Sequence, residues 1–191
     1  MPESPPIVAP HRKAFAGSLP KGGVGIEVGC HVGKFARTLM DKAKPKLLHM
    51  VDLWTRHADT TENYKLNPSA RTRALATQRM IKEIKTHRCI VHQGFSSDVI
   101  PIFPDHYFDW AYIDAAHEYE YVLDDLLKMA PKIKPPGILW GHDYTPFNKN
   151  SGNKYGIIEA VAEFLRQQAH WEMLGLTGEP EFPSFVLRRR R

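Results

Sequence analysis

Two acid–histidine pairs mark the part of this sequence that could do chemistry. Asp114 is followed three positions later by His117, and His142 directly precedes Asp143. A histidine with a pKa of about 6.5 can take a proton from a hydroxyl group near neutral pH. Two carboxylates can share a divalent cation. These side chains therefore predict proton-transfer chemistry, metal binding, or both, provided that the fold brings them together.

The segments around these pairs predict a strand, a helix and a second strand. Residues 108–113 form an aromatic and β-branched run that is typical of a buried strand. Residues 119–133 carry apolar side chains at helical spacing, and the Pro-Pro-Gly run at 135–137 ends that pattern. A second strand is expected over 137–140. Each acid–histidine pair thus follows a strand, at the edge where open α/β sheets bind ligands.

The rest of the chain predicts further β-α units and an antiparallel ending. Upstream, we expect an irregular arm over 1–10, helices over 11–19, 33–43 and 69–86, and a short helix or turn over 96–103. Strands are expected over 24–28, 47–51 and 89–92. Downstream, we expect a helix over 155–168 and a hairpin of strands over 171–176 and 185–190. The β-α alternation implies a parallel sheet with right-handed crossovers.

A glycine turn follows the first predicted strand. Gly29 lets the chain turn sharply, but His31 stands where the second glycine of a dinucleotide-binding fingerprint would be. A pyrophosphate needs that close approach to the backbone, whereas a ligand without phosphates does not. Asp52 ends the next strand and could accept hydrogen bonds from ribose hydroxyls. The pattern favours a nucleoside ligand and opposes a nicotinamide oxidoreductase.

These motifs together resemble a known family. The chain is similar to the class I S-adenosylmethionine-dependent methyltransferases, and within them to the type called methyltransferase domain 24, which includes macrolide sugar O-methyltransferases. The resemblance covers roughly residues 22–190 and is carried by IEVGCHVGKFA, MVDLW, HQGFSSDV, YIDAAHEYEYVLDDL, IKPPGILWGHDY, YGIIEAVAEFL and FPSFVLRR.

The resemblance implies a fold and a cofactor site. The fold would be a Rossmann-like, doubly wound α/β sheet of seven strands in the order 3-2-1-4-5-7-6, with strand 7 antiparallel. S-adenosylmethionine would lie with its ribose on Asp52, its adenine near the turn that begins at Gly94, and its methionine part near Asp114. The implied cofactor-binding residues are Glu27, Gly29, His31, Asp52, Leu53, Gly94, Phe95, Ser96 and Asp114.

The resemblance also implies a reaction. It predicts O-methylation of a hydroxyl on a small molecule, such as a sugar or a natural product, with His117 as the general base. A divalent metal would be held by Asp114, His142 and Asp143. The family pattern has an acid where this chain has His142, and imidazole shifts metal preference from magnesium towards manganese, iron or zinc. We therefore consider magnesium and manganese as candidate ions.

Two other functions are compatible with the same fold. The first is a non-catalytic nucleoside-binding module, which the retained Asp114, His117 and Asp143 make less favoured. The second is a methyltransferase acting on nucleic acid, supported only by a formal charge of +5. A nucleic-acid partner is not favoured, because no recognition motif of a nucleic-acid-binding module is visible. The sequence is also compatible with a homo-oligomer.

Composition predicts one globular domain over 1–191, with residues 1–20 as an N-terminal arm and short helix. No apolar run approaches the roughly 20 residues of a membrane span, and no signal peptide is recognisable. The two cysteines form no CxxC pair, and we expect a cytoplasmic protein. The four arginines at 188–191 are expected to be a solvated tail or the end of the last strand.

Two further segments flank the predicted cofactor site. Residues 55–68 are polar, follow the ribose-binding acid and are expected to form a mobile lid. The helix after them carries exposed charges, for which a solvated face is the default interpretation and a surface for an acidic substrate or partner is the alternative. These residues are Arg71, Arg73, Arg79, Lys82 and Lys85.

Overall fold

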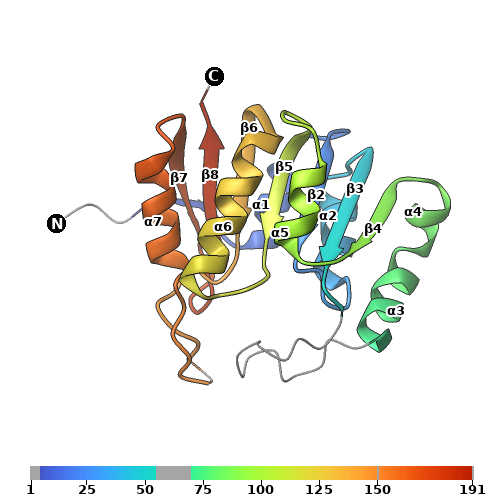
Figure 1. The fold of residues 1–191 in the computed structure, drawn as a ribbon, viewed down its shortest axis with the longest axis horizontal. Helices are drawn as coiled ribbons and strands as arrows, with labels where there is room; N and C mark the ends of the chain where they lie inside the picture. The colour runs from blue at the N-terminus through green and yellow to red at the C-terminus, as the bar shows by residue number, and fades with distance from the viewer. Residues whose placement is uncertain (1–4, 55–69, 150, 191) are drawn as a thin grey trace.

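A mostly parallel sheet forms the centre of the molecule. The structure is a computed structural model and describes residues 5–54, 70–149 and 151–190, in which eight strands form one sheet in the order β1-β7-β8-β6-β5-β2-β3-β4 (Figure 1). The strands are β1 (Ile7–Ala9), β2 (Val24–Val28), β3 (Leu47–Asp52), β4 (Cys89–Gln93), β5 (Phe108–Ile113), β6 (Ile133–Gly141), β7 (Trp171–Thr177) and β8 (Phe185–Arg189). Only β8 runs antiparallel to its described neighbours.

The sheet confirms the predicted class and adds one strand to it. From β2 onwards, the seven strands follow the predicted order, with β8 as the antiparallel strand between β6 and β7. The prediction of an irregular arm over residues 1–10 is wrong in part, because Ile7–Ala9 pairs in parallel with β7 as an edge strand. A segment of three residues is too short to show strand periodicity, so only the available β7 edge determines its conformation.

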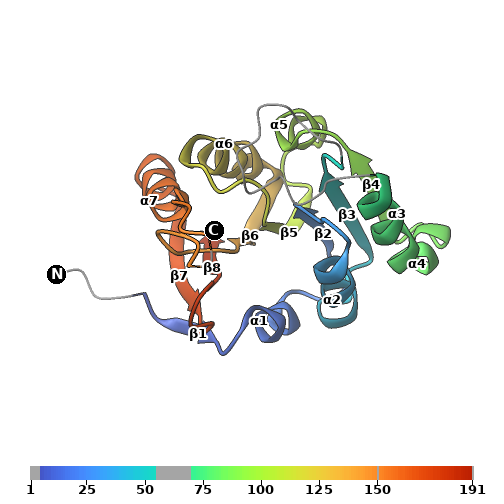
Figure 2. The same ribbon diagram turned by 90° about the horizontal axis from the view of Figure 1, so that it is seen from below.

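Helices cover both faces of the sheet (Figure 2). One layer contains α1 (Arg12–Ser18), α2 (Lys34–Lys42), α3 (Ala70–Arg79) and α4 (Ile81–Lys85). The other contains α5 (Ser96–Val99), α6 (Tyr119–Met129) and α7 (Ile157–Gln167). Alternate residues of the central strands supply the two cores: Trp110 and Tyr112 pack towards the first layer, and Ala111 and Ile113 towards the second.

Proline changes two predicted boundaries. The helix expected to reach Ile133 ends at Met129, because Pro131 cannot continue an α-helix and lies instead in a short 3₁₀ turn (Ala130–Lys132). The following strand starts at Ile133 rather than at residue 137. Its two prolines are tolerated because the register with β5 shifts there and pairing with β8 begins only at Ile138. The helix expected over 69–86 is also divided, although it contains no proline: α3 and α4 meet at Met80.

The arginine-rich C-terminus belongs to the sheet. Arg188 and Arg190 both form ion pairs with Glu172 of the neighbouring strand β7. Arg189 donates a hydrogen bond to the carbonyl oxygen of Ile133. These contacts support the expectation that the basic run is the end of the last strand. Within the described ranges, we find no helix with the length and apolar character needed to span a membrane.

Candidate active site

The two acid–histidine pairs meet at the carboxyl edge of the sheet. Strands β5 and β6 are parallel neighbours, so Asp114 and His142, which directly follow them, lie side by side. The backbone N–H of Asp114 donates to the Val28 carbonyl at 2.8 Å, and that of His142 to the Ile113 carbonyl at 3.1 Å. These bonds continue the ladders of the sheet, which gives both side chains a rigid base.

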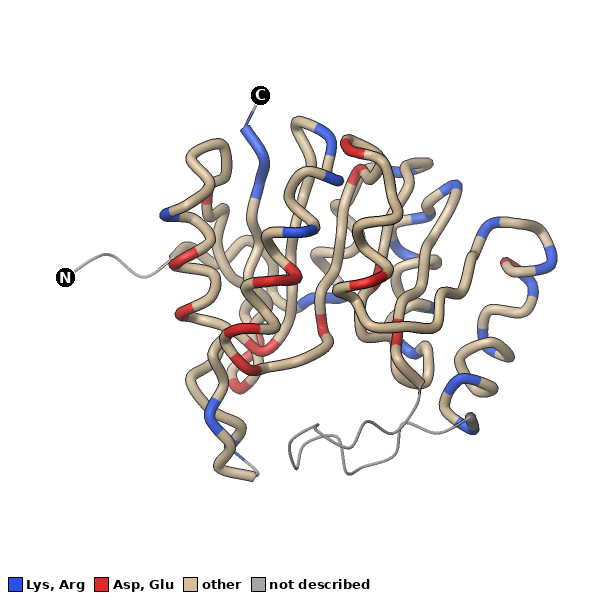
Figure 3. The backbone as a smooth tube through the Cα atoms, in the orientation of Figure 1, with Lys and Arg blue, Asp and Glu red and all other residues tan. Residues whose placement is uncertain are grey.

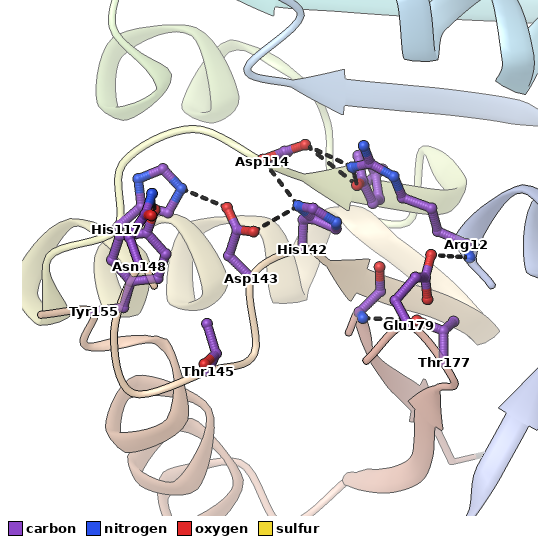
Figure 4. A network of polar contacts seen from close by, with 12 residues as sticks. Arg12, Asp114, His117, His142, Asp143, Thr145, Asn148, Tyr155, Thr177 and Glu179 are labelled. Atoms are coloured by element: carbon purple, nitrogen blue, oxygen red, sulfur yellow. Dashed lines mark hydrogen bonds and ion pairs between the residues drawn. The ribbon is translucent and has the colours of Figure 1, made fainter. Parts of the chain in front are cut away.

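Asp143 is the centre of this group (Figure 4). Its Oδ2 lies 2.7 Å from His117 Nε2, and its Oδ1 lies 2.8 Å from His142 Nδ1. Burial favours the neutral carboxyl, but the two histidines outweigh it and hold the pKa of Asp143 well below its usual range. For His117, burial opposes the charged form, but the bond to Asp143 outweighs it and raises the pKa of the imidazole. The pair therefore favours a carboxylate next to an imidazolium.

His117 is held by contacts on several sides. Its ring stacks on Tyr155 with centroids 4.3 Å apart and planes 14° apart, and the Tyr155 hydroxyl accepts a bond from Asn148 Nδ2 at 2.9 Å. The His117 carbonyl accepts from Gly156 N at 2.7 Å. Because Nδ1 is buried without a partner among the described residues, Nε2 is the nitrogen that faces the polar site. The sequence did not single out Asn148 or Tyr155 for this role.

Asp114 has a cationic partner from the N-terminal helix. Arg12 Nη1 lies 3.1 Å from Asp114 Oδ2 and donates to the Tyr112 hydroxyl at 2.8 Å. The Arg12 guanidinium also lies over the Phe35 ring, 4.8 Å from its centroid, which is a cation–π contact. We did not predict Arg12 as a site residue, and no local signal in the sequence would have identified it. Its partner is distant along the chain and becomes adjacent only when α1 packs on the sheet.

The predicted metal ligands come together with one addition. Asp114, His117 and Asp143 each offer a ligand atom, and these three atoms lie within 4.8 Å of one another. His142 was predicted in place of His117, and its Nδ1 lies 3.9 Å from Asp114 Oδ1 as well as close to Asp143. The donor set of carboxylate oxygens and imidazole nitrogens suits a divalent transition metal. The residues therefore fit the expected ion, although both histidines compete for Asp143.

The predicted cofactor residues line the adjoining strand ends. Gly29 has a φ of +91°, and a Cβ there would lie 1.9 Å from the Asp114 carbonyl oxygen, so only glycine allows this approach. The Asp52 carboxylate accepts the backbone N–H of His31 at 2.7 Å and that of Trp54 at 2.9 Å. Asp52 therefore ties the turn after β2 to the turn after β3. Each of its oxygens retains a second lone pair that could accept a hydrogen bond from a ribose hydroxyl.

The remaining predicted cofactor residues lie at neighbouring positions on this edge. The Leu53 carbonyl accepts from Gln93 Nε2 at 3.2 Å, and Gly94 N donates to the Asp52 carbonyl at 3.1 Å. Ser96 begins α5 directly after Phe95, whose side chain is 41% exposed. The structure thus brings the ends of β2, β3, β4 and β5 into one continuous edge. The predicted lid over 55–68 lies outside the described residues.

Glu27 is a buried acid beneath the glycine turn. Its side chain is 1% exposed, and its Oε2 has no hydrogen-bond partner among the residues described. Burial, reinforced by the charges of Asp114 and Asp52, raises the pKa of Glu27 to about 8. The carboxyl is therefore mostly neutral at pH 7. Trp54, close to this turn, is buried in the core, and its Nε1 donates to the His31 carbonyl.

Comparison with known proteins identifies the family. A family model described as a methyltransferase domain matches residues 26–144, which is more than half of the chain and runs from within β2 to just past β6. The chain is a class I S-adenosylmethionine-dependent methyltransferase. The match includes the described acid–histidine pairs of this methyltransferase. Among curated proteins, no sequence matches it.

Solved structures share the fold of this methyltransferase. A proposed rRNA methylase from Clostridium thermocellum has a TM-score of 0.68 and 12% identity over 94% of this chain and 93% of its own. A proposed methyltransferase from Streptococcus mutans, solved with S-adenosylhomocysteine, has a TM-score of 0.64 and 10% identity over 93% and 94%. The pyocyanin biosynthetic protein PhzM has a TM-score of 0.62 and 13% identity over 88% and 51%. At these identities the likeness is one of fold.

Proposed function

We propose that this methyltransferase transfers the methyl group of S-adenosylmethionine to a hydroxyl of a small molecule, such as a sugar or a natural product. The observation that carries the proposal is the contact of His117 Nε2 with Asp143 Oδ2 at 2.7 Å. It brings an imidazole and a carboxylate together at the carboxyl edge of β5 and β6. The same edge continues to the Gly29 turn, which lies against the Asp114 backbone.

The cofactor would bind across the strand ends next to this pair. Asp52 would accept the ribose hydroxyls, and the exposed ring of Phe95 would contact the adenine face. Asp114 would lie beside the methionine part, close to Glu27 beneath the turn. The further members of the proposed cofactor site are Gly29, His31, Leu53, Gly94 and Ser96. A neutral Glu27 would ionise more readily when the cationic cofactor lies above it, because an opposite charge favours the carboxylate.

In the proposed reaction, the acceptor oxygen forms a bond to the methyl carbon of the sulfonium. The bond between sulfur and that carbon breaks, and its electron pair remains on sulfur, giving S-adenosylhomocysteine. The hydroxyl proton passes to His117 Nε2. The contact with Asp143 favours the imidazolium, so His117 must first lose its Nε2 proton and Asp143 must turn away before Nε2 can accept the hydroxyl proton. The Tyr155 stack would keep the imidazole in place during that change.

A divalent metal would suit the same site. Asp114, His142 and Asp143 would hold it, and when bound it would acidify the acceptor hydroxyl. Its binding would also have to compete with Arg12, which already provides a positive charge to Asp114. The imidazole in the set favours manganese over magnesium.

A transfer assay tests the proposal. The protein would be incubated with S-adenosylmethionine carrying a labelled methyl group and a panel of sugars, catechols and other hydroxylated compounds, with manganese, with magnesium and with excess EDTA. We expect the labelled methyl group in at least one acceptor. The product should be a methyl ether, which resists hydrolysis and which chromatography separates from a methyl ester. Cofactor binding without transfer to any hydroxyl compound would favour a nucleoside-binding module. Full transfer in EDTA would remove the metal and leave His117 as the proposed base.

A further inference from the structure

One short part of the chain carries the whole net positive charge of the molecule. The chain has 26 Lys and Arg and 21 Asp and Glu, and residues 70–90 contain six of the bases and one of the acids. The remainder of the chain therefore has 20 of each and is neutral. The six bases of 70–90, named here the α3–α4 surface, are Arg71, Arg73, Arg79, Lys82, Lys85 and Arg88.

Among the described residues, the positive charges of the α3–α4 surface have no acid paired with them. All six side chains are exposed, whereas Glu83, the only acid of the segment, is buried and paired with Arg37 of α2 at 2.8 Å. Within the described part of the chain, no carboxylate forms an ion pair with any of the six. Figure 3 shows the basic positions following one another along α3 and α4 at the side of the molecule next to β4.

This arrangement differs from that of the basic residues which form ion pairs elsewhere in the described structure. Arg188 and Arg190 pair with Glu172, and Lys128 pairs with Asp124 at 2.6 Å, so those charges are balanced locally. A surface whose charges merely keep the protein soluble usually mixes both signs. A segment with several exposed positive charges attracts a partner with many negative charges.

The α3–α4 surface is extended and adjoins the cofactor turn. Arg71 and Arg79 lie about 12 Å apart along the helix axis, at about 1.5 Å per residue. That distance corresponds to several phosphates of a nucleic-acid strand, which carries one charge per about 3.4 Å. Arg79 donates to the Val32 carbonyl in the turn between β2 and α2, so the surface begins beside the cofactor edge. Its length fits a polymer better than it fits a single phosphate group.

We propose that the α3–α4 surface binds the phosphate backbone of a nucleic acid. Exposed arginine and lysine side chains bind phosphates without reading bases, so this binding would be independent of sequence and sensitive to salt. The contact does not depend on which hydroxyl receives the methyl group. It assigns to this methyltransferase a macromolecular partner in addition to its cofactor and its proposed acceptor.

Fluorescence anisotropy with labelled single-stranded oligouridylate, and in parallel oligothymidylate, tests the proposal. The test variant is Arg71→Gln/Arg73→Gln/Lys82→Gln. The matched control is Lys128→Gln/Arg188→Gln/Arg190→Gln, which removes the same charge from positions that pair with acids. We expect wild-type binding at about 50 mM salt to weaken roughly tenfold or more in the test variant. The slope of log affinity against log salt should fall by about 2, at about 0.7 per phosphate contact.

Several outcomes would overturn the proposal. The first is an equal loss of oligonucleotide affinity in the control variant, which would indicate general charge attraction. The second is a wild-type protein that binds neither oligonucleotide. Binding to vesicles of anionic phospholipid, or to a polyglutamate peptide, with no binding to oligonucleotides would assign the surface to another partner. Calorimetry with S-adenosylmethionine should give the same affinity for all three proteins. It verifies folding and separates a failure here from a failure of the proposed transfer reaction.

Discussion

Arg12 Nη1 lies 3.1 Å from Asp114 Oδ2, so the first helix of the chain supplies a cation to the acid at the end of β5. Both side chains are mostly buried, at 29% and 24% exposed, which limits screening of the pair by water. The contact places a positive charge where a metal would have to bind. Arg12 and a divalent cation therefore compete for Asp114.

Replacing Arg12 should increase affinity for a metal. Without the guanidinium, Arg12→Met should bind Mn²⁺ about tenfold more tightly, because a repelling charge next to Asp114 is removed. Isothermal titration calorimetry with MnCl₂ measures the change. Arg37→Met is the control, since Arg37 pairs with Asp41 and Glu83 away from the site. Unchanged affinity would show that no metal uses Asp114.

Asp52 should determine how tightly the cofactor binds. Its carboxylate is placed to accept the ribose hydroxyls, and a hydrogen bond to a charged group contributes about 1.5–3 kcal/mol. Calorimetry with S-adenosylmethionine should therefore show Asp52→Ala weaker by about that amount. Asp105→Ala removes an exposed acid that pairs with Lys132 and should bind normally. Equal affinities for the two variants would reject the ribose assignment.

His117 should govern the chemical step rather than binding. On an acceptor identified by the transfer assay, His117→Ala should lower the single-turnover rate by about 10²–10⁴-fold, the usual contribution of a positioned base. The dissociation constant of S-adenosylmethionine should not change. Tyr155→Phe keeps the ring that stacks on the imidazole and should retain most of the rate. A His117→Ala variant with the wild-type rate would leave the site with a purely positioning role.

His49 should make the fold sensitive to acid. It is buried in β3, with its Nδ1 2.9 Å from His92 Nε2, and burial together with His92 lowers its pKa to about 4. The unfolded chain binds this proton below pH 6.5 and the folded protein does not, so stability is complete above pH 6.5 and is lost as the pH falls towards 4. At pH 5 the loss should be about 2 kcal/mol.

Urea unfolding at pH 7.5 and at pH 5 measures this loss. His49→Gln cannot take up the proton and should show a smaller difference between the two pH values than the wild type. His170→Gln changes an exposed histidine and should keep the full difference. An identical difference in all three proteins would mean that other groups cause the acid sensitivity.

Glu27 should have the opposite pH dependence. Its folded pKa of about 8 lies above the ordinary 4.5, so the unfolded chain loses this proton first as the pH rises. Its contribution to stability is complete below pH 4.5 and is lost between pH 4.5 and 8. Glu27→Gln cannot ionise and lacks this loss. Between pH 5 and pH 8.5, the wild type should therefore lose roughly 3–5 kcal/mol more of its free energy of unfolding than the variant does. Parallel pH profiles would place the Glu27 carboxyl in a more polar setting than its burial indicates.

The sequence by itself determined most of the strands and helices, and the edge of the sheet at which the acid–histidine pairs lie. Period-two and helical patterns are local, and Gly29 and the prolines end elements through their own backbone restrictions. The sheet order and the family's ligand pattern came from the resemblance, which also indicated that Asp114 and Asp143 follow neighbouring strands. Parallel strands present their carboxyl ends at one edge, so placing these acids together needed no side-chain detail.

Only the tertiary structure decided which groups touch. Arg12 reaches Asp114, and Tyr155 stacks on His117, through helix packing and loop paths that bring distant positions together. The same packing made Ile7–Ala9 a strand, because the open edge of β7 offered hydrogen bonds that the segment could not provide for itself. The α3–α4 surface was visible as a run of basic residues, but only the structure shows that no carboxylate of the described residues pairs with them. Contacts between distant residues depend on the arrangement of the whole chain, and no local pattern encodes them.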